Sequence, residues 1–333
     1  MEGGVFSMRN FNDFTLEIDH YMNDCHSRGL SVKTMKSYEQ TLRLFQRYLF
    51  DKHEIENPAQ VKAEHIKAYF SYTRERGKYR AVADDRTLKI NNPQARPDYG
   101  KQVSETTIAN YQRNINAFFN YLYREKVIRK NPAEGIERIT PERKVKTLLS
   151  ENEIALFFRG FDITTFHGFR NWIIARMILD TGSRIGELLA TVPADIDLRN
   201  GALLLRETKS REERFVFYSD KMRRNLRSWL EYRDRYTDSP YTFPSTRGNR
   251  LQINTIGTAF KRAGERVGVE VHPHQLRNNF AKYYLLNGGD WNSLSRILGH
   301  ASVEVTQQAY LDFTDHEIGN QYQQFSPLKN LDI

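Results

Sequence analysis

Residues 196–218 read IDLRNGALLLRETKSREERFVFY, and this stretch decides the fold class because its pattern favours β-structure in a chain that otherwise favours helices. Two short β-prone runs, ALLL and RFVFY, are separated by the polar segment TKSREE, and Asn200-Gly201 marks a turn before the first run. Short apolar or aromatic runs bounded by turn-forming residues are typical of strands. The stretch therefore predicts a small antiparallel sheet with Lys209 on its turn.

Helical patterns flank this sheet segment on both sides. Before it they cover about 150–159 and 168–180, break at a Gly-Ser pair, and resume near Arg184. After it they return from Lys221 and fill the rest of the chain. Glycine and serine are common interruptions of a helical pattern. The C-terminal part is thus predicted to be mainly helical with one small antiparallel sheet.

A second helical region covers residues from about 11 to 128, where apolar residues recur at the spacing of amphipathic helices. Ser31 is the predicted N-cap of one helix, a second run covers 66–72, and a third helix follows Ser104 and Glu105. The apolar positions of the first and third helices are Tyr38, Leu42, Phe45 and Leu49, and Ile108, Tyr111, Ile115, Phe118, Phe119 and Leu122.

Two polar stretches interrupt the helical patterns. Residues 78–102 show little apolar periodicity and predict a surface loop. Residues 130–146, KNPAEGIERITPERKVK, are rich in proline, glycine and charge and predict an interdomain linker. We therefore expect an all-helical N-terminal domain over 1–130, a linker over 131–146 and a C-terminal domain over 147–333. A length of 333 residues also favours two domains.

The balance of charge favours a polyanionic partner. The formal net charge is +9 and the isoelectric point is about 9.4, which suits nucleic acid above all. Binding to a membrane surface is the charge-based alternative, but it would need the Lys and Arg residues on one amphipathic helix, and here they are spread along the chain.

Composition also bears on the compartment. The mean hydropathy is -0.68, and no stretch approaches the ~20 apolar residues of a membrane-spanning helix. The first residues, MEGGVFSMRNFNDF, lack the basic and apolar blocks of a secretory signal. The single cysteine, Cys25, excludes an internal disulfide framework. We therefore expect a reducing, cytoplasmic location.

Short segments of the C-terminal half carry residue types suited to phosphate chemistry. In TGSRIGELLAT, Arg184 and Glu187 lie three apart on one helical face, where the carboxylate could orient the guanidinium. Lys209 on the predicted turn could reach into a groove. In HPHQLRNNFA, His274 and Arg277 share a face and could bracket a phosphoryl oxygen. Each segment alone is also compatible with ordinary surface residues.

The fourth segment, LGHASVEVTQQAY, places His300 ten residues before Tyr310. A tyrosine acts as a nucleophile only where its neighbours stabilise the phenolate and the charge that develops on phosphorus. The HPH sequence could also suggest a metal site. That interpretation is rejected because Cys25 is remote in sequence and no compact set of further His or Cys ligands exists.

Taken together and in order, these residues resemble the active-site set of the tyrosine recombinase, or phage integrase, family. The resemblance includes the flanking segments TGSRIGELL, H-x-L-R, LGH and VTQQAY, and it spans most of 180–312. The helical N-terminal region is similar to the family's core-binding domain. The residues that carry the resemblance are Arg184, Lys209, His274, Arg277, His300 and Tyr310.

The resemblance implies a site-specific recombinase that cleaves and rejoins double-stranded DNA as a homotetramer. Tyr310 would attack the scissile phosphate, forming a 3′-phosphotyrosine and freeing a 5′-hydroxyl. Arg184 and Arg277 would hold the non-bridging oxygens, and Lys209 would protonate the leaving 5′ oxygen. No metal, ATP or other cofactor would be needed, because the phosphotyrosine link conserves the bond energy.

Three further residues have implied roles. His274 would assist proton transfer at the nucleophile, His300 would hydrogen-bond the phosphate, and Glu187 would support the site. The loop between His300 and Tyr310 would have to place the phenol in line with the scissile bond.

The sequence departs from the family pattern at two points. Asn278 follows HQLR where relatives often carry His or Arg, and the spacing from His300 to Tyr310 is one residue longer than in some members. Tyr283 and Tyr284 are nearby alternatives to the nucleophile, but they lack the LGH context.

Several alternatives stay open. A type IB topoisomerase, a DNA-binding regulator with a decayed active site, and a structural protein without a DNA partner are the rival functions. The tail after Tyr310 could dock on a neighbouring subunit or on its own domain. The target sequence and the setting, whether integration, excision or resolution of a mobile element or replicon, are also open.

Overall fold

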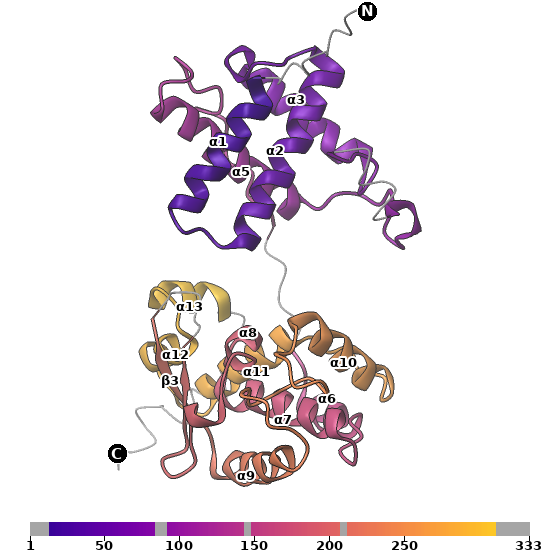
Figure 1. The fold of residues 1–333 in the computed structure, drawn as a ribbon, viewed down its shortest axis with the longest axis vertical. Coiled ribbons are helices and arrows are strands. Elements are labelled where there is room, and N and C mark those ends of the chain that lie inside the picture. Colours follow the sequence, from indigo (N-terminus) through magenta and orange to yellow (C-terminus); the bar gives the residue numbers. More distant parts are fainter. Residues whose placement is uncertain (1–12, 84–91, 143–147, 207–211, 311–333) are drawn as a thin grey trace, which may run out of the picture. The chain divides into compact units, whose positions relative to one another are not determined.

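The described part of the chain divides into two units, each with its own hydrophobic core. An N-terminal unit covers Met1–Lys144 and a C-terminal unit covers Val145–Ile333 (Figure 1). The computed structural model describes residues 13–83, 92–142, 148–206 and 212–310. The tail that follows Tyr310 lies outside these residues.

The N-terminal unit is helical throughout its described ranges, as predicted. Its helices are α1 (Asp13–Ser27), α2 (Val32–His53), α3 (Ala63–Arg76) and α5 (Glu105–Arg124), with 3-10 turns η1 (Pro58–Gln60) and η2 (Pro93–Ala95). Ser31 caps α2 and Ser104 caps α5, because each hydroxyl accepts a hydrogen bond from an amide three residues on. The predicted N-cap at Ser31 is therefore confirmed.

Aromatic side chains fill the core of the N-terminal unit. Phe14 of α1, Phe45 of α2 and Phe118 of α5 are fully buried. The ring centroids of Phe14 and Phe118 lie 5.8 Å apart, and those of Phe14 and Phe45 lie 6.3 Å apart. Aromatic pairs at such distances add to the stability that burial provides. The apolar stripes predicted from the sequence thus face one shared core.

The segment after α5 stays attached to the N-terminal unit. Gln112, buried on α5, donates through Nε2 to the carbonyl of Glu137 at 2.8 Å. Its Oε1 accepts from the amide of Ile139 at 2.7 Å. Ala133 is buried in the same core. The stretch predicted as a linker therefore begins as a segment packed on this unit, and its described part, 131–142, has no helix or strand.

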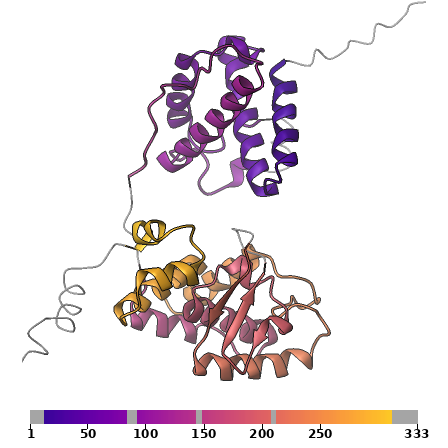
Figure 2. The same ribbon diagram turned by 90° about the vertical axis from the view of Figure 1, so that its left-hand side faces the viewer.

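The C-terminal unit carries an antiparallel sheet of strand order β1-β2-β3. The strands are β1 (Ile196–Asp197), β2 (Ala202–Leu205) and β3 (Arg214–Phe217). Leu203 pairs with Val216, and both side chains are buried. Figure 2 shows the strands side by side, with α9 at the bottom of the view. The predicted hairpin is confirmed, whereas β1, only two residues long, was not predicted.

Helices build most of the C-terminal unit. Their bounds are α6 (Glu151–Arg159), α7 (Phe166–Thr181), α8 (Ile185–Leu188), α9 (Asp220–Asp234), α10 (Ile253–Glu265), α11 (Pro273–Leu286), α12 (Trp291–Leu298) and α13 (Val303–Tyr310), with a 3-10 turn η3 (Pro193–Asp195). The predicted fold class, mainly α with a small antiparallel sheet, is confirmed.

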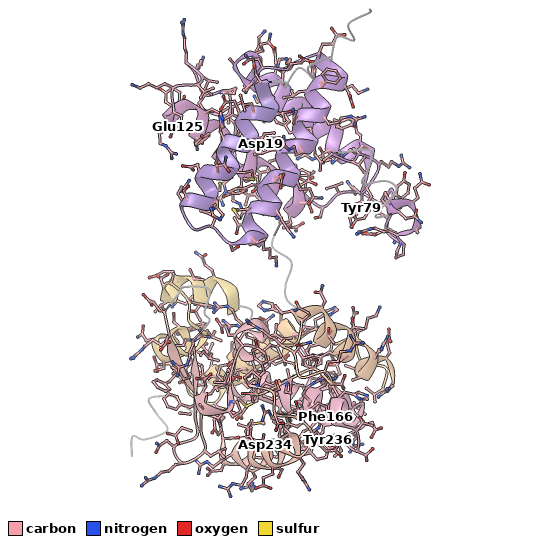
Figure 3. All side chains as sticks on the ribbon, in the orientation of Figure 1. Asp19, Tyr79, Glu125, Phe166, Asp234 and Tyr236 are labelled. Atoms are coloured by element: carbon pink, nitrogen blue, oxygen red, sulfur yellow. The ribbon has the colours of Figure 1, made fainter. Side chains whose placement is uncertain are left out.

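Helix α7 is the centre of the C-terminal unit. Its residues are buried or half-buried over 168–181, and it packs against both α9 and α11. Phe166, at its start, lies beside Tyr236, with ring centroids 5.6 Å apart (Figure 3). The ring of Trp229 on α9 lies 5.3 Å from that of Phe166. The middle of α7, residues 173–178, therefore supplies a large part of the core of this unit.

The prediction that helices fill the chain beyond Lys221 is wrong for residues 235–252. This segment is irregular and contains an isolated bridge between Pro244 and Arg250. Buried polar side chains hold it in place: Arg170 donates to the carbonyl of Pro244 at 2.7 Å, and Trp229 donates to that of Thr242 at 3.0 Å. Prolines and a glycine break the helical pattern here.

None of the helices in the described ranges is long and apolar enough to cross a membrane.

Candidate active site

Arg184 and Glu187 lie at the start of the short helix α8. The Arg184 amide donates to Glu187 Oε2 at 3.1 Å, and its Nη1 donates to Oε1 at 2.9 Å. The Glu187 side chain is only 4% exposed, whereas that of Arg184 is 29% exposed. The predicted pair is therefore present, with a buried carboxylate orienting a guanidinium that solvent can still reach.

Arg277 is the more buried of the two predicted phosphate-binding arginines. It lies on α11 and is 3% exposed. Its guanidinium donates to the carbonyl of Gly182, after α7, and to the carbonyl of Leu298, at the end of α12, at 2.8 Å. The same guanidinium lies 3.2 Å from Nε2 of His300. Arg277 thus ties three sequence-distant segments together.

His300 follows the end of α12, where Gly299 adopts a left-handed conformation with φ of 61°. Nε2 of His300 is the ring atom that faces the Arg277 guanidinium. Nδ1 of the same ring lies 2.8 Å from the hydroxyl of Thr306 on α13. Thr306 is fully buried. The two contacts, one at each ring nitrogen, fix the orientation of the imidazole.

A fourth contact joins these groups. Nη2 of Arg184 donates to the carbonyl of Gly299 at 3.1 Å, one residue before His300. Arg184, Glu187, Arg277 and His300 therefore form one connected cluster, contributed by α8, α11 and the turn after α12.

The remaining predicted residues are His274, Lys209 and Tyr310, and the structure describes only part of this set. His274 is exposed on the first turn of α11, three residues before Arg277. Lys209 lies outside the described residues. The backbone of Tyr310 belongs to α13, which packs against α11 and α12, but its side chain is not among those described. The expectation of a loop before Tyr310 is wrong, because α13 already begins at Val303.

Arg214 is a residue of this cluster that the sequence analysis missed. It begins β3, and its Nη1 and Nη2 donate to the two carboxylate oxygens of Glu187 at 3.1 Å and 2.7 Å. The signal was present in the strand period of two, because Val216 and Tyr218 on the same face are buried. An arginine at that inward position predicts a buried anionic partner.

The electrostatics of the cluster keep Glu187 ionised. Burial alone raises the pKa of its carboxyl, but the hydrogen bonds and charges of Arg214 and Arg184 outweigh burial and hold the pKa below its ordinary value. Among the described residues, no group of three or more His, Cys, Asp or Glu side chains could hold a metal ion.

Comparison with known families matches both units. Residues 137–317 match the model of the phage integrase family, and residues 18–88 match the phage integrase N-terminal SAM-like domain. The first match covers more than half of the chain. The C-terminal unit thus carries the catalytic region of a class of DNA-recombining proteins, and the chain belongs to the phage integrase family.

Individual relatives agree. The chain is 25% identical to the tyrosine recombinase XerD of Listeria monocytogenes serovar 1/2a, over 95% of this chain and 99% of that protein. It is 30% identical to the tyrosine recombinase XerC of Pseudomonas savastanoi pv. phaseolicola, over 63% of this chain and 71% of that protein. The chain is therefore a tyrosine-type site-specific recombinase that breaks and rejoins DNA, as the resemblance implied.

Solved structures show the same fold. The integrase of the transposon Tn1549, in complex with transposon right end DNA, matches with a TM-score of 0.69 at 16% identity, over 93% of this chain and 99% of that chain. A lambda integrase dimer bound to a COC′ core site matches with a TM-score of 0.65 at 17% identity, over 89% of this chain and 94% of that chain.

Proposed function

We propose that this recombinase cleaves double-stranded DNA through a 3′-phosphotyrosine formed by Tyr310. One observation carries the proposal: Arg184 and Arg277 are held by the ends of α7 and α12, beside His300, and α13 leads from His300 to Tyr310. Two fixed guanidiniums can neutralise the charge that develops on the oxygens of a phosphorane.

The proposed step balances without a cofactor. The Tyr310 phenol oxygen bonds to phosphorus while the bond to the 5′ oxygen breaks, and Lys209 protonates the leaving oxygen. His274 assists removal of the phenol proton, and His300 hydrogen-bonds the phosphate. Glu187 supports the site by orienting Arg184. The 5′-hydroxyl of a partner strand then attacks the phosphotyrosine and restores a phosphodiester, which exchanges strands.

The division of labour follows the two units. The helical N-terminal domain, residues 1–130, clamps the DNA, and the catalytic domain, residues 147–333, cleaves it. Residues 131–146 connect the two, with their first part packed on the N-terminal unit. The active assembly is a homotetramer on a specific recombination site. The solved lambda integrase dimer bound to a COC′ core site, and its tetramer bound to a Holliday junction, support this assembly.

The setting follows from the chemistry. Strand exchange at a specific site serves integration, excision or resolution of a mobile element or replicon. A DNA substrate and a single cysteine suit a cytoplasmic, nucleoid-associated protein.

The experiment is to trap the protein on DNA in cells, purify covalent complexes under denaturing conditions, and sequence the attached strand. Tyr310→Phe should bind DNA but give no covalent complex, because it lacks the attacking oxygen. Tyr283→Phe is the matched control and should still be trapped.

Three outcomes would overturn the proposal. Trapping by Tyr310→Phe would move the nucleophile elsewhere. Absence of trapping by the wild-type chain would favour a DNA-binding regulator. Supercoil relaxation without strand exchange would favour a topoisomerase.

A further inference from the structure

We infer that Arg214 is a positioning residue of this active site, which sets the place of Arg184 through Glu187 and the place of the His300 turn through Ile297. The inference rests on the proposed function, because Arg184 and His300 have their roles only there. The relevant elements are β3, α8 and the end of α12, which hydrogen bonds of Arg214 and Arg184 bring together in the folded unit.

The first observation is the pairing of Arg214 with Glu187. Nη1 and Nη2 of Arg214 reach different carboxylate oxygens, at 3.1 Å and 2.7 Å. Such a two-pronged pair fixes orientation as well as distance. The Arg214 side chain is 12% exposed and the Glu187 side chain 4%, so water screens the pair little.

The second observation is that each carboxylate oxygen of Glu187 accepts hydrogen bonds from both Arg184 and Arg214. Oε1 accepts from Nη1 of Arg184 at 2.9 Å as well as from Arg214, and Oε2 accepts from the Arg184 amide at 3.1 Å. Without Arg214, the carboxylate could rotate about its side-chain bonds, and Arg184 would lose its fixed reference.

The third observation connects Arg214 to the turn before His300. Nε of Arg214 donates to the carbonyl of Ile297, in the last turn of α12, at 3.0 Å. The guanidinium also lies directly against Gly299: a Cβ built there would be 2.9 Å from Cζ of Arg214. The carbonyl of Gly299 in turn accepts from Nη2 of Arg184 at 3.1 Å.

Arg214 therefore contacts both supports of Arg184, which are the Glu187 carboxylate and the Gly299 segment. Its own guanidinium is committed, because Nε, Nη1 and Nη2 all have partners. Arg184 is the more exposed of the two, at 29% against 12%. DNA is thus held by Arg184, and Arg214 acts through it.

The test is a double-mutant cycle on single-turnover cleavage of the site identified by trapping. Arg214→Ala should slow cleavage about 100-fold, because small misplacements of catalytic groups cost about that much. The dissociation constant of Arg214→Ala for DNA should change less than about threefold, since the other contacts of the protein with DNA phosphates remain. In an Arg184→Ala background, the same change should slow cleavage by less than about threefold, because residues in one network are not additive.

Two further variants separate positioning from stability. Arg214→Lys keeps the charge but not the fork, and it should restore only part of the rate. Arg233→Ala removes another buried guanidinium, which donates to the carbonyl of Tyr241 at 2.9 Å away from this cluster. Arg233→Ala should lower the melting temperature. Any factor by which it slows cleavage should be the same in the wild-type and the Arg184→Ala backgrounds. All rates are compared below the melting temperature of the least stable variant.

The outcomes distinguish this inference from the proposed function. If the wild-type chain is trapped on DNA and Arg214→Ala cleaves normally, or if its effect multiplies with that of Arg184→Ala, the inference alone is overturned. If the wild-type chain is never trapped, the proposed function fails, and the inference fails with it.

Discussion

At the scale of single residues, the Glu187 carboxylate organises the positive charges of the site. An ionised carboxylate is costly to bury unless it is paired and hydrogen-bonded. Glu187 accepts four hydrogen bonds, two from Arg184 and two from Arg214. Removing one member of a buried ion pair is strongly destabilising, because the charge of the remaining member is then buried without an opposite charge.

Glu187→Gln should therefore lower the free energy of unfolding by about 3 kcal/mol near neutral pH, because two guanidiniums lose their anion. The folded pKa lies below the ordinary value of 4.5, so the stabilisation is complete above that value and is lost as the pH falls through the folded pKa. Denaturant unfolding of both proteins from about pH 7 to about pH 3 measures this. The difference between them should narrow at acid pH; a difference independent of pH would refute the expectation.

At the scale of elements, helix C-termini hold the guanidiniums. The last carbonyls of a helix have no partner within it, and the helix dipole makes that end negative. Arg277 donates to the carbonyl of Gly182, after α7, and to that of Leu298, at the end of α12. Arg184 donates to the carbonyl of Gly299. The C-terminal ends of α7 and α12 thus supply three carbonyl oxygens that accept hydrogen bonds from these two arginines.

Gly182→Ala tests how closely the end of α7 packs against α11. Gly182 has φ of +64°, and an added Cβ would lie 2.3 Å from Cδ1 of Phe280. The left-handed conformation and the overpacking together should lower the free energy of unfolding by about 2–4 kcal/mol. Thermal or chemical denaturation gives the value.

Gly268→Ala is the matched control for that change. Gly268 has φ of +71°, but nothing lies within 4 Å of an added Cβ. It should cost only about 1 kcal/mol, from the backbone conformation alone. An equal loss of unfolding free energy in the two variants would mean that the contact with Phe280 does not contribute to the effect of Gly182→Ala.

At the scale of the whole molecule, the net charge of +9 belongs to a chain whose two units both match a DNA-recombining family. Each unit has a core of its own, aromatic in the N-terminal unit and centred on α7 in the C-terminal one. Positive charge spread over the chain suits many phosphate contacts rather than one.

Binding of the Tyr310→Phe variant to its site should weaken steeply with salt, because each neutralised phosphate releases counterions. With about six to ten phosphate contacts, the association constant should fall by about 10³ or more between roughly 50 mM and 200 mM salt. Fluorescence anisotropy of labelled DNA measures the slope. Binding that does not change with salt would contradict a phosphate-dominated interface.

Much of this fold could be predicted because its elements are encoded locally. Apolar spacing identified α2 and α5, and two β-prone runs around a polar turn identified the β2–β3 hairpin. The strand β1 and the irregular segment 235–252 were missed. A strand of two residues has no readable alternation, and the irregular segment is held by buried side chains from α7 and α9.

The sequence by itself determined the helical pattern, the hairpin and the order of the residues that resemble an integrase active site. Only the tertiary structure decided how these residues are supported. Arg214 and Glu187 are 27 positions apart, and Arg277 reaches a carbonyl 95 positions away. A hydrogen bond to a backbone carbonyl requires no particular side chain at the acceptor residue, so it leaves no mark in the sequence. The geometry of the site therefore becomes visible only when α7, α11 and α12 pack together.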